Sequence, residues 1–307
     1  MAEIVFEQTQ IQSGNFCGMT ISALRKRLDA GEFIVAPGVY DMISALAADR
    51  MAFPALYMTG YGVSASHLGL PDAGLASYTD MVSRVGVIAQ GTNTPLIADA
   101  DTGFGGLLNV DHAVKGYGRA GAAAMQIEDQ EYPKRCGHTP GRRVVPIEDM
   151  VRKIRVAVEA RDSRDFLIVA RTDARTTLGL DEAIRRGEAF AEAGADILFI
   201  ESPESEDEMA TICSRLKGTP LLANIVEGGR TPVLPQDRLE ALGYQISIHP
   251  GSAFMAAASA YKGIYNSLKA NGSTVGTNVP MLSFADMNVL VGFDRVWSFE
   301  RQHPELE

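Results

Sequence analysis

The chain has 307 residues, of which 46% are hydrophobic and 21% are charged, and its formal net charge is −10. This composition is typical of a folded globular protein and excludes a largely disordered chain. The negative charge, with no basic stripe and no run of interleaved aromatic residues, excludes a broad nucleic-acid-binding surface and favours small-molecule partners.

The N-terminal segment MAEIVFEQTQIQSGNF has no positively charged stretch followed by an apolar one. Nowhere in the chain do about 18 apolar residues follow one another, as a membrane-spanning helix would require. The three cysteines, Cys17, Cys136 and Cys213, lie far apart and predict no disulfide framework. We therefore expect a cytoplasmic protein that does not associate with membranes.

Short apolar runs recur along the chain, and each is bounded by turn residues. Continuous apolarity is typical of strands buried on both faces, as in a parallel sheet covered by helices. The segments between them, such as 181–195 (DEAIRRGEAFAEAGA), have helical spacing and end at a glycine. The predicted strands are 33–36, 55–59, 95–99, 124–128, 166–171, 197–201, 220–225 and 244–249.

Eight strand–helix units predict an α/β fold, a (β/α)8 barrel. The alternative, a doubly wound open sheet, usually has fewer strands and a glycine fingerprint after the first, which GVYD (38–41) does not supply. No linker divides the chain, so we expect one domain over 1–307. Its part from about Asn271 to 307 reads as a loop followed by an additional C-terminal helical extension, which we expect to serve a neighbouring subunit.

Polar side chains gather where predicted strands end, whereas the strand starts carry mainly Gly, Pro, Ala and Phe. Active sites in this barrel are built at the carboxyl ends of the strands, so this polarity predicts an active site there. The strand-end motifs are TGYG (59–62), DADTGFGG (99–106), IEDQ (127–130), ARTDAR (170–175), IES (200–202) and ANIVEGG (223–229).

Asp99 and Asp101 predict a metal site. They are two residues apart at a strand end, so their side chains can point the same way, and two like charges held together need a cation or a shared proton. With Glu128 and Asp129 nearby and no histidine cluster, these oxygen ligands favour Mg2+ or Mn2+ over zinc. The alternative is that one aspartate caps the next helix.

Arg171 follows an apolar strand, where a buried guanidinium needs a carboxylate. That carboxylate belongs either to the protein, with Glu201 as a candidate in a structural ion pair, or to a substrate. Asn224 can hold a carboxylate or a hydroxyl, or be a satisfied core asparagine. The backbone N–H groups of Gly60 and Tyr61 can bind an anion, although such a turn is weak evidence alone.

The pentapeptide KRCGH (134–138) places a thiol among positive charges. Cationic neighbours lower the pKa of a thiol, which makes Cys136 a candidate for proton transfer or nucleophilic attack. The alternative is an ordinary cysteine in a charged loop.

Taken in order, the motifs TG-G, LGLPD (68–72), DADTGFG, IEDQ, KRCGH, ARTDA, ES and AN resemble the isocitrate lyase and phosphoenolpyruvate mutase superfamily, from about Gly31 to the end. DADTGFG with KRCGH resembles its carbon–carbon lyase branches: methylisocitrate lyase, dimethylmalate lyase, petal death protein and oxaloacetate acetylhydrolase. The chain departs from the methylisocitrate branch at Tyr61 and Met255, where that branch carries glycine and arginine. The tail SFADMNVLVGFD (283–294) is more similar to the dimethylmalate lyase, petal death and acetylhydrolase group.

The resemblance implies roles for the strand-end and loop residues. Asp99 and Asp101 would hold Mg2+, with Glu128 in the outer shell and Asp72 of LGLPD supporting the same region. The segment Lys134 to His138 would be a mobile gate over the ligand, with Lys134 and His138 among the catalytic groups. The side chains and amides expected to face the substrate are those of Tyr57, Thr59, Gly60, Tyr61, Arg171, Glu201 and Asn224.

The implied reaction is Mg2+-dependent cleavage of a 2-alkylmalate-type acid, such as 2,3-dimethylmalate or 2-methylisocitrate, to a 2-oxo acid such as pyruvate and a carboxylate. Tyr57 is the candidate base, and Cys136 would protonate the enolate from a thiol that ionises near neutrality.

The alternatives are hydrolysis of oxaloacetate to oxalate and acetate, with Ser252 bonding a hydrated keto group, and oxaloacetate decarboxylation. Others are phosphoenolpyruvate mutation, phosphonopyruvate hydrolysis and a barrel that only binds dicarboxylates. Relatives of this kind are usually homotetramers that exchange the last barrel helix between subunits.

Overall fold

A computed structural model describes the backbone of residues 16–304 and the side chains of residues 21–304. Residues 1–15, which include nearly all of the N-terminal segment expected to lack a leader, lie outside the described residues, as does the side chain of Cys17. The chain divides into two compact units, a barrel unit (1–252) and a C-terminal unit (253–307). This division falls earlier than the boundary near Asn271, and the single-domain expectation stays a prediction.

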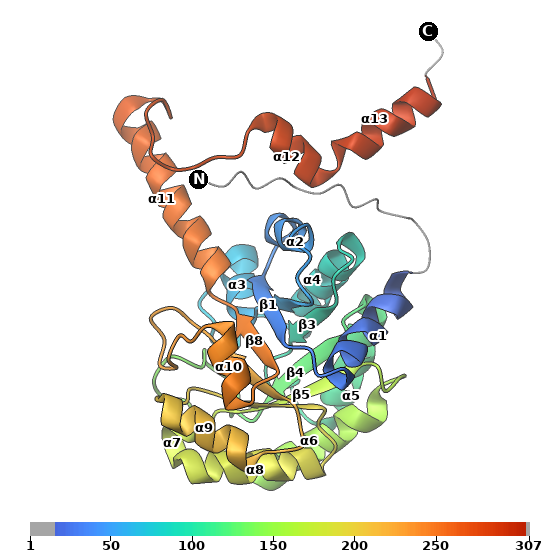
Figure 1. Cartoon of the computed structure of the whole chain (residues 1–307), viewed down its shortest axis with the longest axis vertical. Coiled ribbons are helices and arrows are strands. Elements are labelled where there is room, and N and C mark those ends of the chain that lie inside the picture. The colour runs from blue at the N-terminus through green and yellow to red at the C-terminus, as the bar shows by residue number, and fades with distance from the viewer. Residues whose placement is uncertain (1–15, 305–307) are drawn as a thin grey trace. The chain divides into compact units, whose positions relative to one another are not determined.

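The strands of the barrel unit form a closed, all-parallel barrel in chain order, in which β1 pairs with β8. Each predicted strand is confirmed within a few residues (Figure 1). Nearly all strand residues are buried, because the helices cover the outer face and side chains fill the interior. The strands are β1 (Ile34–Val39), β2 (Leu56–Met58), β3 (Leu96–Asp99), β4 (Ala124–Glu128), β5 (Leu167–Thr172), β6 (Ile197–Ile200), β7 (Leu221–Asn224) and β8 (Ile246–His249).

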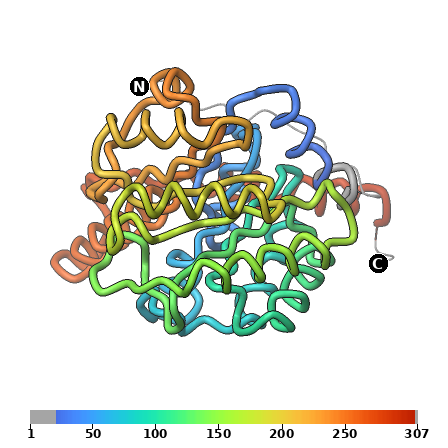
Figure 2. The backbone as a smooth tube through the Cα atoms, turned by 90° about the horizontal axis from the view of Figure 1, so that it is seen from below, coloured from blue at the N-terminus to red at the C-terminus, as the bar shows by residue number. Residues whose placement is uncertain are grey.

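Helices connect successive strands, and in Figure 2 the colour can be followed around the barrel from blue to orange. Among the described residues, no helix is both long enough and apolar enough to cross a bilayer. The helices before β8 are α1 (Phe16–Asp29), α2 (Met42–Asp49), α3 (Gly60–Val63), the π-helix η1 (Ser64–Leu68), α4 (Tyr78–Gly91), α5 (Leu107–Ala120), α6 (Ile147–Ala160), α7 (Ala174–Leu178), α8 (Leu180–Glu192), α9 (Glu206–Arg215) and α10 (Gln236–Leu242).

Local signals in the sequence explain where helices begin and end. Asp41 caps α2 by accepting a hydrogen bond from the Ser44 N–H at 2.8 Å, and Ser77 caps α4. The helix predicted over 181–195 ends at Glu192, and Gly194 follows it with φ +98°, a conformation that favours glycine.

The C-terminal unit is helical and carries many exposed apolar side chains. It contains α11 (Ser252–Asn271, which begins at the boundary), α12 (Phe284–Val291) and α13 (Phe293–Gln302). The loop 272–283 before α12 confirms the predicted loop followed by additional helix. The exposed side chains include Tyr261, Tyr265, Leu268, Val275, Met281, Leu282, Phe284 and Phe299.

Candidate functional site

The carboxyl ends of β2 to β7 bring most of the predicted site residues together at one mouth of the barrel. Asp99 ends β3 and is 6% exposed, Glu128 ends β4 and is 1% exposed, and Asn224 ends β7. Arg171 lies near the end of β5, and Glu201 directly follows β6. The prediction that polar groups at the strand ends gather at one face of the barrel is confirmed.

The two aspartates of DADTGFGG meet, but not through the pleat of one strand. β3 ends at Asp99, and Asp101 lies beyond it with φ +48°. The turn directs the Asp101 N–H to Asp99 Oδ1 at 3.0 Å. Asp99 also accepts hydrogen bonds from the Gly60 N–H (3.2 Å) and the Gln126 side chain (3.4 Å). The alternative role as a helix cap is excluded, because Gly106 is the N-cap of α5.

Lys134 joins the loop KRCGH to these acids. Its ammonium lies 2.7 Å from Asp101 Oδ1 and 2.5 Å from Asp72 Oδ1, and its side chain is 3% exposed. Burial lowers the pKa of Lys134, but the attraction of Asp101, Asp72 and Asp99 more than offsets this and holds the pKa well above its ordinary value. Lys134 is therefore a buried cation at neutral pH.

The positive charge of Lys134 does not fully compensate the buried acids around it. Burial, with the neighbouring Asp99 and Asp72 carboxylates, raises the pKa of Asp101 to about 6 despite the opposing effect of Lys134. Glu128 Oε1 is buried and, among the described residues, has no hydrogen-bond partner. Burial likewise raises the pKa of Glu128 well above its ordinary value.

These residues fit a hard divalent cation such as Mg2+ or Mn2+ better than zinc. Among the described residues, no group of three or more His, Cys, Asp or Glu side chains is arranged to hold a metal ion directly. Mg2+ commonly uses one or two carboxylates and keeps several waters, so Asp99, Asp101 and the unpartnered Glu128 oxygen suit it.

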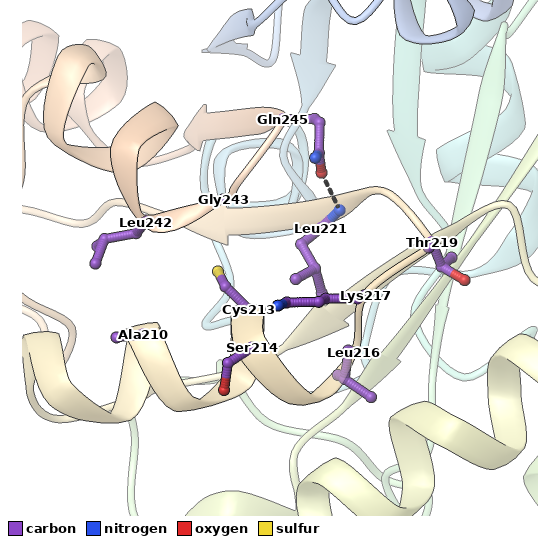
Figure 3. A pocket seen from close by; sticks show the side chains of 11 residues that line it. Ala210, Cys213, Ser214, Leu216, Lys217, Thr219, Leu221, Leu242, Gly243 and Gln245 are labelled. Carbon is purple, nitrogen blue, oxygen red and sulfur yellow. Dashed lines mark hydrogen bonds between the residues drawn. The ribbon is translucent and has the colours of Figure 1, made fainter.

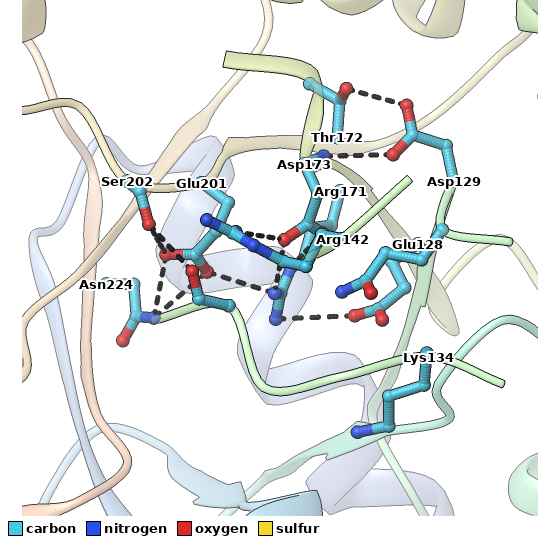
Figure 4. Close-up of polar contacts among 12 residues, drawn as sticks. Glu128, Asp129, Lys134, Arg142, Arg171, Thr172, Asp173, Glu201, Ser202 and Asn224 are labelled. Atoms are coloured by element: carbon cyan, nitrogen blue, oxygen red, sulfur yellow. Dashed lines mark hydrogen bonds and ion pairs between the residues drawn. The ribbon is translucent and has the colours of Figure 1, made fainter. Parts of the chain in front are cut away.

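Arg171 lies at the centre of a buried set of acids (Figure 4). Its Nε and Nη2 donate to the two oxygens of Asp173, both at 2.9 Å. The guanidinium also lies 3.4 Å from Glu128 and 3.4 Å from Glu201, and its Cζ is 5.1 Å from the centre of the Phe199 ring. Burial lowers the pKa of Arg171, but these three acids outweigh burial and raise it well above its ordinary value.

A second arginine supports this arrangement from the segment that follows KRCGH. Arg142 Nη1 donates to Asp173 Oδ1 at 2.7 Å and Nη2 donates to Thr176 at 2.7 Å. Burial raises the pKa of Asp173, but Arg171 and Arg142 outweigh it and lower the pKa below its ordinary value. Asp173 is therefore an ionised carboxylate that orients Arg171.

The loop with Cys136 packs closely over Arg171 and Glu201. A Cβ on Gly137 would lie 2.5 Å from Arg171 Nη2 and 2.7 Å from Glu201 Cδ, so only glycine fits there without displacement. The Gly137 carbonyl accepts a hydrogen bond from Ser202 Oγ at 3.1 Å. KRCGH therefore lies over the same mouth as Asp99 and Asp101.

The predicted lowering of the Cys136 pKa is wrong. Burial raises the pKa of the thiol to about 11, which outweighs the hydrogen bond from the His138 N–H and the attraction of Arg171. Lys134, two residues before Cys136, is paired with Asp72 and Asp101. The thiol is therefore a protonated group at neutral pH, suited to donate a proton and not to attack as a thiolate.

This correction predicts the pH dependence of alkylation. Iodoacetamide reacts with thiolate, so its rate at Cys136 should rise about tenfold per pH unit through pH 10, whereas a free thiol levels off near its ordinary pKa of about 8.5. Short pulses of iodoacetamide, followed by mass spectrometry of the peptide that contains Cys136, measure this rate. N-acetylcysteine is the reference thiol. A plateau at Cys136 below pH 9 would contradict the assignment.

His138 links the end of the loop to β6 and β7. Its Nδ1 accepts from the Arg230 N–H at 3.3 Å, and its Nε2 lies 3.6 Å from Glu201 Oε1. Burial lowers the pKa of His138, despite the opposing effect of Glu201, so the imidazole is neutral at pH 7. Asn224 donates to Glu201 Oε2 at 3.1 Å, while its own Oδ1 is buried without a partner among the described residues.

The residues at the carboxyl end of β2 have other contacts than those expected for substrate binding and for a catalytic base. The Tyr57 hydroxyl donates to Gln126 Oε1 at 2.9 Å, and burial, followed by Asp99, raises its pKa well above the ordinary value, which weighs against the role of base. The Gly60 N–H is occupied by Asp99 and is not available to a substrate anion. Thr59 caps α3, and Tyr61 is 41% exposed.

Two predicted residues are bonded elsewhere. Ser252 donates to Glu227 Oε1 at 2.6 Å, and within the described residues no hydrogen bond joins it to another predicted site residue. Asp129, considered as a metal ligand, accepts from Thr172 (2.6 Å) and Arg186 (2.8 Å) in a buried structural network.

Sequence reasoning missed Gln126, Arg142 and Asp173. Gln126 bridges Tyr57 and Asp99 from within β4, and its presence in an apolar strand was a usable signal, because buried amides are hydrogen-bonded. Arg142 had no such signal, since its partner Asp173 is 31 positions away.

A separate pocket of about 410 Å3 lies by α9 and α10, near the start of β7 (Figure 3). It is lined by Cys213, Lys217 and Gln245, and Gln245 Oε1 accepts from the Leu221 N–H at 2.8 Å. Burial raises the pKa of Cys213 to about 12. This is the amino end of the strands, where conservation in barrels relates to stability rather than catalysis.

Proteins of known activity resemble the chain over nearly its whole length. A family model described as phosphoenolpyruvate phosphomutase matches residues 24–269. The 2,3-dimethylmalate lyase of Eubacterium barkeri is 48% identical over 284 residues, which are 92% of this chain and 98% of that protein. The 2-methylisocitrate lyase of Aeropyrum pernix is 44% identical over 283 residues, 92% of this chain and 90% of that protein.

Solved structures show the same fold. A complex of oxaloacetate acetylhydrolase with 3,3-difluorooxalacetate has a TM-score of 0.87 and 34% identity, and covers 94% of this chain and 97% of that one. A complex of phosphonopyruvate hydrolase with oxalate and Mg2+ has a TM-score of 0.84 and 32% identity, and covers 93% and 99%.

Proposed function

Because the chain belongs to the phosphoenolpyruvate mutase/isocitrate lyase superfamily and is a carbon–carbon lyase of it, we propose that it cleaves a 2-alkylmalate-type acid. 2,3-Dimethylmalate is the first candidate and 2-methylisocitrate the second. The products are a 2-oxo acid, pyruvate for these two substrates, and a carboxylate.

The proposed cofactor is Mg2+, with Mn2+ as a substitute. Asp99 and Asp101 would hold it, directly or through water, and Glu128 and Asp72 would lie around it. When bound, the ion supplies Lewis-acid stabilisation of the negative charge that develops at the C2 oxygen. The buried, unpartnered Glu128 Oε1 and the raised pKa of Asp101 support a cation at this place.

The chain's own residues bind and orient the acid. Arg171, held by Asp173, presents a fixed cation to a substrate carboxylate beside the Glu128 and Glu201 oxygens. The unpartnered Asn224 Oδ1 can accept a hydrogen bond from a substrate hydroxyl. KRCGH packs over Arg171 and Glu201 and so covers this space.

The thiol of Cys136 completes the reaction as an acid. The C2 hydroxyl proton passes through water to solvent, and the C2–C3 bond breaks with its electron pair left on C3 as an enolate. C3 then takes the proton of Cys136, and the resulting thiolate recovers a proton before the next turnover. A neutral Tyr57 serves as a hydrogen-bond donor in this scheme, and the proton of the C2 hydroxyl is not assigned to it.

One observation carries the proposal: the 2.7 Å ion pair between Lys134 and Asp101 joins the thiol-bearing loop to the proposed metal aspartates. The proposed acid and the proposed metal ligands thus belong to the same mouth, which supports cleavage between adjacent carbons.

Pyruvate formation from 2,3-dimethylmalate in the presence of Mg2+ is the expected result, and EDTA should abolish it until Mg2+ is restored. The assay runs malate derivatives and oxaloacetate in parallel and measures pyruvate, oxalate and CO2 together. Mg2+-independent turnover, or no pyruvate from any malate derivative, would overturn the proposal.

Oxaloacetate hydrolysis is the second candidate, supported by the structural similarity to the acetylhydrolase. It would appear in the same panel as oxalate from oxaloacetate. Ser252 was expected to bond a hydrated keto group in this reaction, but its hydroxyl bonds Glu227 instead. CO2 release from oxaloacetate would indicate decarboxylation instead.

A homotetramer with exchanged helices is part of the proposal. The exposed apolar side chains on α11, α12 and α13 support burial of the C-terminal unit against other copies of the chain. A cytoplasmic location stays a prediction.

A further inference from the structure

Gln130 is a buried amide whose side chain, in the part of the chain that the structure describes, forms hydrogen bonds with Arg135 and not with the proposed metal aspartates or Arg171. It is 2% exposed and lies two residues beyond the end of β4. Its backbone forms an antiparallel bridge with Val144. On either side, the Val145 N–H donates to the Asp129 carbonyl and the Glu131 N–H donates to the Arg143 carbonyl, both at 2.8 Å. The Gln130 side chain therefore extends from a backbone that these hydrogen bonds hold in place.

The amide of Gln130 bonds both main-chain groups of Arg135. Its Oε1 accepts from the Arg135 N–H at 2.9 Å, and its Nε2 donates to the Arg135 carbonyl at 2.8 Å. These two hydrogen bonds resemble those that a neighbouring β-strand would form with the Arg135 backbone, although Arg135 lies in a loop.

The Arg135 carbonyl belongs to the peptide that leads into Cys136. The N–H of the same peptide, on Cys136, donates to the Asp72 carbonyl at 3.1 Å. Both polar groups of this peptide are therefore held, one by Gln130 and one by Asp72. On the far side, the Thr139 N–H (2.9 Å) and hydroxyl (2.8 Å) both donate to the Cys136 carbonyl.

We infer that Gln130 is a positioning residue for the thiol: its side-chain amide fixes the peptide before Cys136 and so sets where the proton donor stands over the site. This inference rests on the proposed role of Cys136 as the acid. A loop without this contact retains the ion pair of Lys134 with Asp101 but loses one of the two hydrogen bonds that hold the peptide before Cys136.

The test compares Gln130→Met, which keeps the side-chain length but removes both bonds, with the wild-type protein. Losing two intramolecular hydrogen bonds should raise the rate of Cys136 alkylation at pH 8 by about 5- to 150-fold. kcat should fall while KM changes by less than about threefold, because Gln130 does not touch substrate. The alkylation rate is read at Cys136 by mass spectrometry.

Tyr132→Phe is the matched control, since it removes one bond of the same loop, from the Tyr132 hydroxyl to the Gly74 carbonyl at 2.7 Å, away from the thiol. It should change both readouts by less than about threefold. Gln130→Glu, which keeps an acceptor for the Arg135 N–H but faces the Arg135 carbonyl with a carboxylate, replaces Gln130→Met should that variant not fold, with the same expectation.

Unchanged alkylation and unchanged kcat in a folded Gln130 variant would overturn the inference. Equal changes in Tyr132→Phe would do the same, because they would show general loosening of the loop. If the wild-type protein cleaves no substrate in the panel, the proposed function fails, and the alkylation rates alone decide whether Gln130 places the thiol.

Discussion

Cys136→Ser is expected to lower kcat for cleavage by about 10²- to 10⁴-fold, the usual contribution of a positioned acid, with KM changed by less than about threefold. Serine keeps the shape of the side chain and can accept the hydrogen bond from the His138 N–H. Its hydroxyl is a far weaker acid than a thiol whose pKa is about 11, so protonation of the enolate carbon becomes limiting. Steady-state kinetics on the best substrate of the panel measures both constants.

Cys213→Ser is the control for this substitution. Cys213 is the other cysteine among the described side chains, with a pKa raised to about 12 by burial, and it lies in α9 by the pocket at the opposite end of the strands. The kcat of Cys213→Ser should stay within about twofold of wild type, because Cys213 lies at the amino end of the strands and not at the barrel mouth. A Cys136→Ser enzyme with wild-type kcat would remove the thiol from the mechanism.

Arg171→Leu should reduce the free energy of unfolding by about 3–5 kcal/mol, a large part of the stability of an ordinary domain. The substitution leaves the Glu128, Asp173 and Glu201 carboxylates, all 1% exposed or less, without the guanidinium that neutralises them. Urea unfolding followed by circular dichroism gives the free energy of unfolding. The same variant should lose cleavage activity, because the cation facing the substrate carboxylate is gone.

Arg175→Leu is the control for burial. Arg175 also pairs with two acids, Glu204 at 2.7 Å and Glu208 at 2.5 Å, but the side chain of Glu204 is 42% exposed and that of Glu208 is 23% exposed. Water screens such pairs, so the loss should be about 0–1 kcal/mol. Equal losses in the two variants would show that burial of the Arg171 acids does not set the effect.

The sequence by itself determined the barrel and the face on which its polar groups lie. Strands buried on both sides must be apolar throughout, so eight short runs such as 166–171 were visible without any contact information. Parallel strands all end at one face, so Asp99, Glu128, Arg171 and Glu201 could be grouped from their places at strand ends alone.

Only the tertiary structure decided the electrostatics and the supporting contacts. In the sequence KRCGH, cations stand close to Cys136. In the folded protein, however, Lys134 forms ion pairs with Asp72 and Asp101, and burial raises the pKa of the thiol. In the same way, Gly60 turned out to serve Asp99 and Gln130 to hold Arg135. The pKa of a group depends on its burial and on charges brought from distant segments, and the spacing of residues along the chain contains neither.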